Sequence, residues 1–124
     1  MMRFHTRKWI KPNETLFGGR LLEWIDEECA LYSIVQLENP KTVTKFMSEI
    51  DFKSSAKKGD IVEIGIEVLK FGTASLTLKC EVRNKMTQES ILTIDKIVMV
   101  GLDDTGKPKA HGKKEIEFVK DRLS

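Results

Sequence analysis

The stretch PNETLFGGRLLEWIDE, residues 12–27, contains the change of pattern from which the fold of this chain can be predicted. Its first part is expected to be a loop, because Pro12 disfavours helix in the residue before it and Asn13 suits a turn. After the glycine pair, apolar residues begin to recur at intervals of three and four, the spacing of a helix that buries one side. We therefore expect a long helix to begin at about Arg20.

The helical pattern continues to Leu37, and Glu38, Asn39 and Pro40 form the expected stop, since a proline shortly after the last periodic residue is typical of a helix end. Three glutamates, at positions 23, 27 and 28, lie mostly to one side of the predicted helix. Eight residues carry the apolar period: Leu21, Leu22, Trp24, Ile25, Cys29, Ala30, Tyr32 and Val35.

Everything after Lys41 is predicted to be sheet. Apolar and polar residues alternate there with the period of two that marks strands. With a short edge strand in the first ten residues this makes about five strands, and the short turns between the later ones predict an antiparallel meander. One helix laid across one such sheet buries both apolar faces, so the fold class is α+β. The four later strands are expected at residues 42–52, 61–71, 74–83 and 91–102.

The length of 124 residues fits a single domain, residues 1–124, of which about 104–124 form a basic tail. A solvated, partly mobile terminus is the expected state of that tail. The chain has no apolar run of the roughly 18 residues that a membrane helix needs, and its N-terminus lacks the apolar region of a secretory signal. We therefore expect a cytoplasmic protein with no membrane partner. The net charge of +2 is too small to indicate nucleic-acid binding.

Two cysteines and two histidines are the residues from which a metal site would have to be built. Cys29 and Cys80 lie in apolar-patterned segments, so buried, reduced thiols are expected. The cysteines and the histidines, His5 and His111, show no close spacing of the kind that zinc ligands have. No metal is therefore expected.

Asp26 interrupts the apolar side of the predicted helix. At about 100° per residue it shares a face with Leu22, Cys29, Ala30 and Ser33. Burying an unpaired carboxylate is costly, so such a residue is paired, exposed at the margin of the face, or retained for function. On the residues alone, a boundary aspartate and a functional aspartate both remain open.

Gly18 and Gly19 mark a second candidate site at the start of the same helix. The first turn of a helix has backbone N–H groups without intrahelical partners, and its dipole favours negative charge. Glycine allows a substrate carbonyl to approach that backbone, so the position could serve as an oxyanion hole. A pair of glycines also serves as a plain turn.

Together these residues resemble the signature of the acyl-CoA hydrolase group of hot-dog-fold thioesterases. That signature has an asparagine, three residues, a Phe or His before two glycines, six further residues, and then an aspartate followed by an acidic residue. The turn after Gly72 departs mildly from the family, which often has Arg or Ser and then a second Ser where this chain has Thr73, Ala74 and Ser75. The resemblance spans about residues 5–102, and it is carried by Asn13, Phe17, Gly18, Gly19, Asp26 and Glu27 and by residues 43–44, 50–52, 59–60 and 70–75.

The resemblance implies a hot-dog fold, in which a curled antiparallel sheet wraps one long central helix, and an enzyme that hydrolyses acyl-CoA to a fatty or other carboxylic acid and coenzyme A. Asp26 would be the general base or the nucleophile, Asn13 would place water or polarise the thioester, and the Gly19 amide would bind the carbonyl oxygen. The substrate's coenzyme A part would contact Gly18, Thr44, Lys70, Gly72, Thr73 and Ser75.

The resemblance also implies an active site shared between the subunits of a homodimer, and a hexamer built from three dimers. Coenzyme A would enter only as part of the substrate and product, with no other cofactor. Lys57, Lys58 and the basic residues of the tail are candidates for binding its phosphates.

Three other functions are weighed against hydrolysis. A hydratase or dehydratase on the same fold needs a catalytic histidine near its aspartate, whereas His5 and His111 lie in terminal segments. A non-catalytic module that binds or senses acyl-CoA would need neither Asn13 nor Asp26. A purely structural protein would be affected by replacement of Asp26 in its local stability alone.

Overall fold

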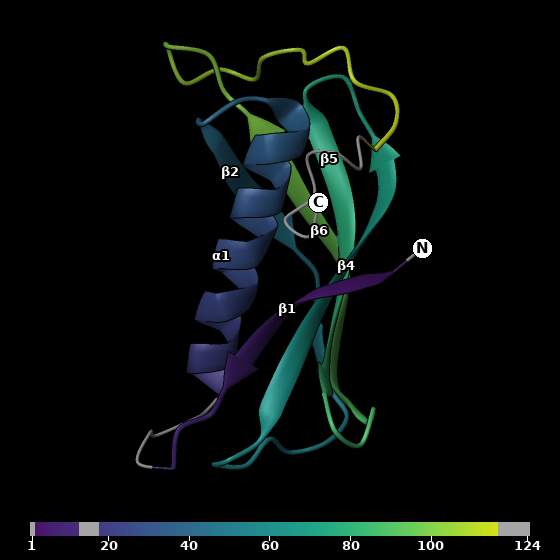
Figure 1. Cartoon of the computed structure of the whole chain (residues 1–124). Coiled ribbons are helices and arrows are strands. Elements are labelled where there is room, and N and C mark those ends of the chain that lie inside the picture. Colours follow the sequence, from purple (N-terminus) through teal and green to yellow (C-terminus); the bar gives the residue numbers. More distant parts are fainter. Residues whose placement is uncertain (1, 13–17, 117–124) are drawn as a thin grey trace.

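The computed structural model describes residues 2–12 and 18–116 (Figure 1). The helix and strands follow the predicted order, with one difference: the strand expected at 42–52 is divided in two around Ser48, whose amide donates to the carbonyl oxygen of Lys96 at 2.8 Å. The sheet therefore has six strands instead of about five. In chain order the elements are β1 (Arg3–Trp9), α1 (Gly18–Leu37), β2 (Thr42–Met47), β3 (Ile50–Phe52), β4 (Ile61–Phe71), β5 (Ser75–Asn84) and β6 (Ser90–Gly101).

The sheet is antiparallel throughout, with strand order β1-β4-β5-β6-β2, and β3 also pairs with β6. The predicted meander is confirmed for β4, β5 and β6. It is wrong for β2 and β3, because the loop at residues 53–60 carries the chain from β3 across to β4 on the other side of the sheet. This crossing places the long apolar β6 inside the sheet and leaves the edges to shorter strands, which limits unwanted edge pairing.

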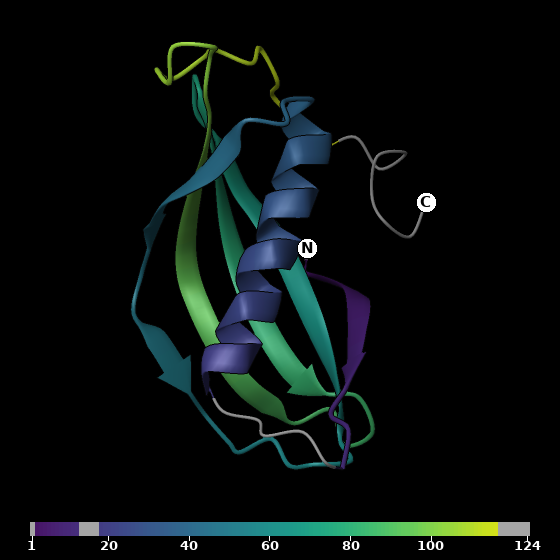
Figure 2. The ribbon, with the colours of Figure 1, turned by 90° about the vertical axis from the view of Figure 1, so that its left-hand side faces the viewer.

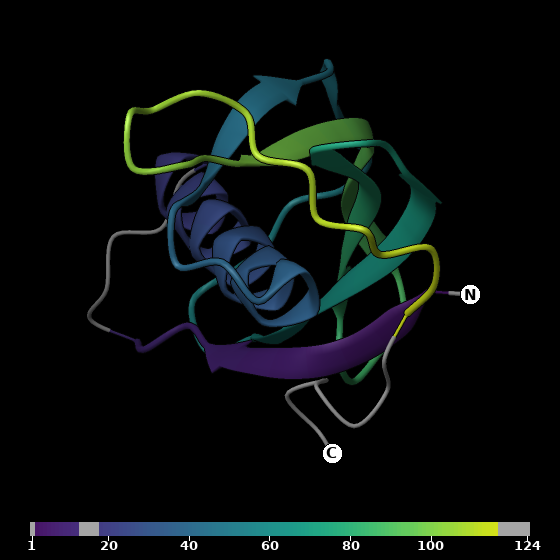
Figure 3. The ribbon, with the colours of Figure 1, turned by 90° about the horizontal axis from the view of Figure 1, so that it is seen from above.

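The sheet curls around α1, as the views in Figures 2 and 3 show. The predicted arrangement of one helix wrapped by a curled antiparallel sheet is confirmed. Side chains at alternate positions of β4 and β5 point toward the helix, as the period of two requires. The core lies between them and the helix, and it includes Leu21, Ile25, Tyr32, Val62, Ile64, Ile66, Leu76, Leu78 and Val82.

The helix ends where the sequence predicts. Glu38 adopts the left-handed conformation with φ of 55°, and the amide of Asn39 donates to the carbonyl oxygen of Ile34 at 3.1 Å. The Asn39 side chain then donates to the carbonyl oxygen of Leu102 at 3.1 Å. A Cβ at Gly101 would lie 2.8 Å from that Asn39 amide nitrogen, so the end of β6 approaches the helix end too closely for a side chain.

Both cysteines are buried, as predicted, and neither forms a disulfide in this structure. The pKa of the Cys29 thiol is raised well above its ordinary value, first by its hydrogen bond with Cys80, then by burial and by the negative charges of Asp26 and Glu28. Cys29 is therefore a protonated thiol at neutral pH, which makes it a poor nucleophile.

No helix in the described parts of the chain is both long and apolar enough to span a membrane.

Candidate functional site

Asp26 lies at the margin of the helix face that packs on the sheet, and its side chain is exposed. The hydroxyl of Thr44 on β2 donates to its Oδ1 at 3.0 Å, and the same hydroxyl oxygen lies 3.4 Å from Sδ of Met99. A carboxylate that accepts one hydrogen bond at Oδ1 still has Oδ2 free to act on a water molecule or a substrate. The structure thus pairs Asp26 with Thr44, two residues that the sequence had placed separately in a catalytic and a binding role.

The strand beside Asp26 is open on both faces in the single chain. Residues 43–46 of β2 are all exposed, although side chains of one strand alternate between two faces. Val43 is 44% exposed and Phe46 is 49% exposed, and Phe52 on β3 is 55% exposed. Large apolar side chains grouped along one edge mark a surface suited to a partner.

Gly19 lies in the first turn of α1, seven residues before Asp26. Seven residues make about two helical turns, so both lie on the same side of the helix, about 10 Å apart along its axis. Gly19 is exposed, and among the residues that the structure describes a Cβ there would meet no atom within 4 Å. Packing against the described part of the chain therefore does not require glycine at this position. Asn13 lies outside the described residues.

The turn between β4 and β5, residues 72–74, brings four of the predicted binding residues together in the turn or beside it: Lys70, Gly72, Thr73 and Ser75. The amide of Gly72 donates to the carbonyl oxygen of Ser75 at 2.9 Å. A Cβ at Gly72 would overlap Oγ of Ser75, so any side chain at position 72 would force that hydroxyl to move. Lys70 and Thr73 are exposed beside it.

The C-terminal segment, residues 102–116, packs on this β4–β5 turn, although the sequence predicts a solvated tail. The amide of His111 donates to the carbonyl oxygen of Thr73 at 3.1 Å, and its ring Nε2 lies 2.9 Å from the carbonyl oxygen of Ser75. The ring also meets Phe71 edge-on, with centroids 5.9 Å apart. Sequence reasoning missed this contact, since the segment has no apolar period that would show where it packs.

An open hollow of about 640 Å³ lies between the β4–β5 turn and the C-terminal segment. Lys70, Lys113 and Lys114 are among its lining residues. Of these, Lys113 also forms an ion pair of 3.0 Å with Glu38 at the end of α1. The hollow is basic, as a site for anionic groups would be.

The start of α1 and the β4–β5 turn lie at opposite ends of the folded subunit. Figure 1 shows α1 beginning at one end of the sheet, while the β4–β5 turn lies at the end where α1 finishes. The loop before β4, residues 53–60, which contains Lys57 and Lys58, lies at the end where α1 begins. One chain alone therefore does not bring Gly19 together with the β4–β5 turn in a single pocket.

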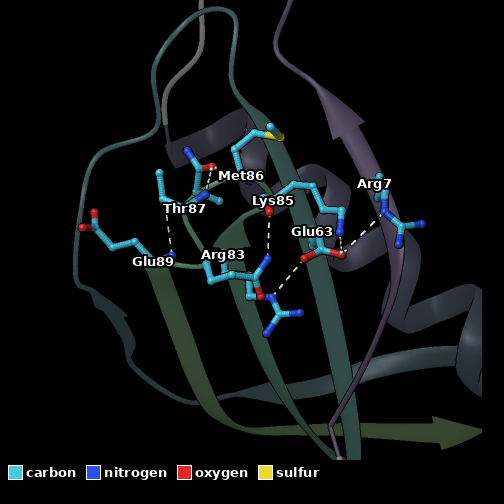
Figure 4. A network of polar contacts seen from close by, with 9 residues as sticks. Arg7, Glu63, Arg83, Lys85, Met86, Thr87 and Glu89 are labelled. Atoms are coloured by element: carbon cyan, nitrogen blue, oxygen red, sulfur yellow. Dashed lines mark hydrogen bonds and ion pairs between the residues drawn. The ribbon is translucent and has the colours of Figure 1, made fainter.

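A second polar cluster lies on the outer face of the sheet (Figure 4). Glu63 is buried there, with Nε of Arg83 at 3.0 Å, Nε of Arg7 at 3.5 Å and Nζ of Lys85 at 3.8 Å. The guanidinium of Arg83 also lies 3.6 Å from the ring centre of Phe4. The cations compensate the buried carboxylate and tie β1, β4 and β5 together, so this cluster has a structural role.

Neither histidine forms the pair with Asp26 that a dehydratase would need. His5 is buried on β1 with its ring stacked on Tyr32 at 6.1 Å, and His111 contacts the β4–β5 turn. Asp26 is instead hydrogen-bonded to a threonine. Among the residues that the structure describes, no group of three or more His, Cys, Asp or Glu side chains could hold a metal ion.

Comparison with known sequences gives two matches. The family model of the thioesterase superfamily matches residues 13–91. A Bacillus subtilis protein described as an uncharacterized acyl-CoA thioester hydrolase is 31% identical over 103 residues, which cover 77% of this chain and 57% of that protein. The chain thus spans little more than half the length of this relative.

Similar solved structures include an acyl-CoA hydrolase from Staphylococcus aureus in complex with butyryl coenzyme A, coenzyme A and coenzyme A disulfide. It is 27% identical, with a TM-score of 0.76 over 88% of this chain and 68% of that one. An apo hexameric acyl-CoA thioesterase is 32% identical, with a TM-score of 0.71 over 89% of this chain and 73% of that one. A hexameric thioesterase from Yersinia pestis is 24% identical and shares the fold, with a TM-score of 0.78 over 90% of this chain and 96% of that one.

Proposed function

The chain belongs to the thioesterase superfamily, and we propose that it is an acyl-CoA thioesterase that hydrolyses acyl-CoA to a carboxylic acid and coenzyme A. Its architecture is the hot-dog fold of its structural neighbours. The observation that carries the proposal is the Asp26 carboxylate, oriented by Thr44 and placed on the same side of α1 as the open Gly19.

The proposed reaction assigns one task to each group. Oδ2 of Asp26 takes a proton from a water molecule as the water oxygen bonds to the thioester carbon, or Oδ2 itself attacks that carbon to form an anhydride that water then hydrolyses. The carbonyl oxygen becomes an oxyanion at the Gly19 amide, where the helix start supplies free N–H groups. The thiolate of coenzyme A leaves as the carbonyl re-forms. A thiolate is a fair leaving group, so the reaction needs no further cofactor.

The residue types altered in the S. aureus hydrolase support this assignment. Variants of that protein have an aspartate, an asparagine or a threonine replaced by alanine, the types found here at Asp26, Asn13 and Thr44. The altered asparagine and aspartate are 15 positions apart there (43 minus 28), against 13 here (26 minus 13). The altered threonine follows the aspartate by 17 positions there (60 minus 43), against 18 here (44 minus 26). By spacing, Thr44 matches that pattern better than Asn13 does.

We propose that the active enzyme is a homodimer, with three dimers forming a hexamer. A two-fold axis across α1 exchanges the two ends of the chain, so the β4–β5 turn of one subunit reaches the helix start of the other. The exposed Val43, Phe46 and Phe52 supply apolar surface for such contacts. The similar structures from Y. pestis and of the apo acyl-CoA thioesterase are hexameric.

In this assembly the coenzyme A part of the substrate contacts Gly18, Thr44 and the β4–β5 turn, including Lys70. The lysines of the hollow beside that turn, together with Lys57 and Lys58, are the proposed partners of its phosphates. We propose a cytoplasmic enzyme that acts on a small-molecule thioester without a nucleic-acid or membrane partner.

Thiol release from a series of acyl-CoA esters tests the proposal, with Asp26→Asn as the variant and Glu89→Gln as the matched control. Glu89 is an exposed carboxylate in the turn before β6, outside the signature. We expect Asp26→Asn to lose at least about 100-fold in kcat, as removal of a general base does, and the control to keep wild-type activity. The proposal is wrong if no ester is turned over, or if the folded Asp26→Asn variant matches wild type. Binding of coenzyme A without turnover would instead identify a non-catalytic module.

A further inference from the structure

The two ring nitrogens of His111 have different, fixed roles. Nε2 lies 2.9 Å from the carbonyl oxygen of Ser75, which can only accept, so Nε2 carries a proton. Nδ1 accepts a hydrogen bond of 2.8 Å from the backbone amide of Lys113, so Nδ1 carries none. Both partners are backbone groups whose donor and acceptor roles cannot change. The contacts therefore select one neutral tautomer of the ring.

His111 joins the C-terminal segment to both sides of the β4–β5 turn. Its amide donates to the carbonyl oxygen of Thr73, and its ring donates to the carbonyl oxygen of Ser75, the same oxygen that accepts from the Gly72 amide. Its ring edge packs against Phe71, the last residue of β4. One residue, through its backbone amide and its ring, thus contacts the residues before, within and after the turn.

We propose that His111 is a positioning residue for the coenzyme A site, which holds the β4–β5 turn in its binding conformation only while the ring is neutral. Protonation of Nδ1 would set an N–H against the Lys113 N–H and remove that hydrogen bond. Acidification then loosens the C-terminal segment and the turn together and weakens coenzyme A binding. This inference rests on the proposed function, because it takes the turn to be part of the substrate site.

Charged side chains from three segments lie around the ring. Lys70 faces the hollow from β4, and Lys109, Lys113 and Lys114 lie on the C-terminal segment itself. Glu38, from the end of α1, lines the neighbouring hollow with His111 and is paired with Lys113 at 3.0 Å. The ring therefore lies mainly among cationic side chains.

The tautomer can be measured without any substrate. Two-dimensional NMR of the histidine ring nitrogens distinguishes protonated from unprotonated Nδ1 and Nε2. We expect His111 to be in the Nε2–H form at about pH 7.5 and the doubly protonated form to appear on acidification, together with faster tryptic cleavage after Lys113 and Lys114. An Nδ1–H tautomer at neutral pH, or cleavage that does not change with pH, would overturn the inference. This readout stands even if no acyl-CoA ester is hydrolysed.

Two variants separate the ring's charge from its hydrogen bonds. His111→Gln keeps an amide N–H for the Ser75 carbonyl and cannot be protonated, whereas His111→Phe keeps the contact with Phe71 and loses both ring hydrogen bonds. Lys107→Gln, an exposed lysine of the same segment, is the matched control. His5 is present in every variant, so its contribution is the same throughout the comparison.

For wild type and the control we expect KM for an acyl-CoA ester to rise about fivefold between about pH 7.5 and pH 5.5, the effect of one lost hydrogen bond. KM of His111→Gln should rise less than that of wild type over that range, the remaining rise coming from protonation of the substrate's phosphate, and KM of His111→Phe should be raised at both values. At each pH, kcat should be the same for all four proteins. The inference fails if His111→Gln follows the wild-type profile, or if the variants change kcat and leave KM unaltered.

Discussion

Oγ1 of Thr44 on β2 lies 3.0 Å from Oδ1 of Asp26 on α1, so a strand at the edge of the sheet orients a carboxylate carried by the central helix. The contact links residues 18 positions apart in sequence (44 minus 26). Because β2 has little cover on either face in the single chain, anything that binds along this edge can also alter the position of the carboxylate.

Thr44→Val removes this hydrogen bond while keeping the shape of the side chain. We expect kcat for acyl-CoA hydrolysis to fall about tenfold, the value of a hydrogen bond to a charged group at an exposed site. Thr44→Ser, which keeps the hydroxyl, should recover most of the activity. Steady-state kinetics of folded variants measure both. Equal loss in Thr44→Ser and Thr44→Val would mean that the hydroxyl is not the group that matters.

Gly19→Ala separates a functional glycine from a structural one. A Cβ there meets no atom within 4 Å, and alanine favours helix over glycine, so the free energy of unfolding should stay equal to wild type or rise by up to about 1 kcal/mol. The added methyl group would stand in front of the helix amides, and we expect kcat to fall at least about tenfold. Urea unfolding and hydrolysis assays together test this. A variant with unchanged stability and full activity would remove Gly19 from the site.

Thr6 links β1 to α1 inside the core, where its hydroxyl donates to Oε1 of the buried Glu28 at 2.7 Å. Thr6→Val should lower the free energy of unfolding by about 1.5–3 kcal/mol, because it removes a hydrogen bond to a buried carboxylate. Thr93→Val, on β6, is the control and should change stability by less than about 0.5 kcal/mol. Equilibrium urea denaturation provides the measurement, and similar midpoints for the two variants would contradict the expectation.

Cys29 links stability to alkaline pH. Its pKa is raised in the folded protein by the hydrogen bond with Cys80, by burial and by nearby carboxylates, so the folded state keeps the thiol proton that the unfolded state loses above about pH 8.5. Its contribution to stability is therefore complete below that pH and declines as pH rises toward the folded-state pKa. Urea midpoints should fall more steeply above about pH 9 for wild type than for Cys29→Ala. Parallel curves would show that this thiol does not titrate differently on folding.

Local patterns predicted the elements of this fold well. The period of α1 and its stop at Glu38 were readable because apolar spacing and proline act within a few residues. The division of the 42–52 strand and the pairing of β2 and β3 with β6 could not be predicted, because contacts between distant segments determine which strands pair. The order of strands in the sheet therefore had to come from the structure.

Some residues of the candidate site could likewise be identified from the sequence, and others could not. Asp26 stood out as a carboxylate on an apolar helix face, and Gly72 as a turn residue, so both could be named from sequence. The contact of Asp26 with Thr44 depends on how β2 lies beside α1, and no spacing rule predicts it. His111 was missed because a segment without periodic apolar residues gives no signal of where it packs. The role of Asn13 stays a prediction, since it lies outside the described residues.

The placement of the helix start and the β4–β5 turn at opposite ends of one chain has a genetic consequence. If each active site takes Asp26 from one subunit and the Gly72 turn from the other, a dimer of one Asp26→Ala chain and one Gly72→Ala chain has both defects in one site and neither in the other. Two alleles that are each inactive alone would then complement one another when they are expressed in the same cell.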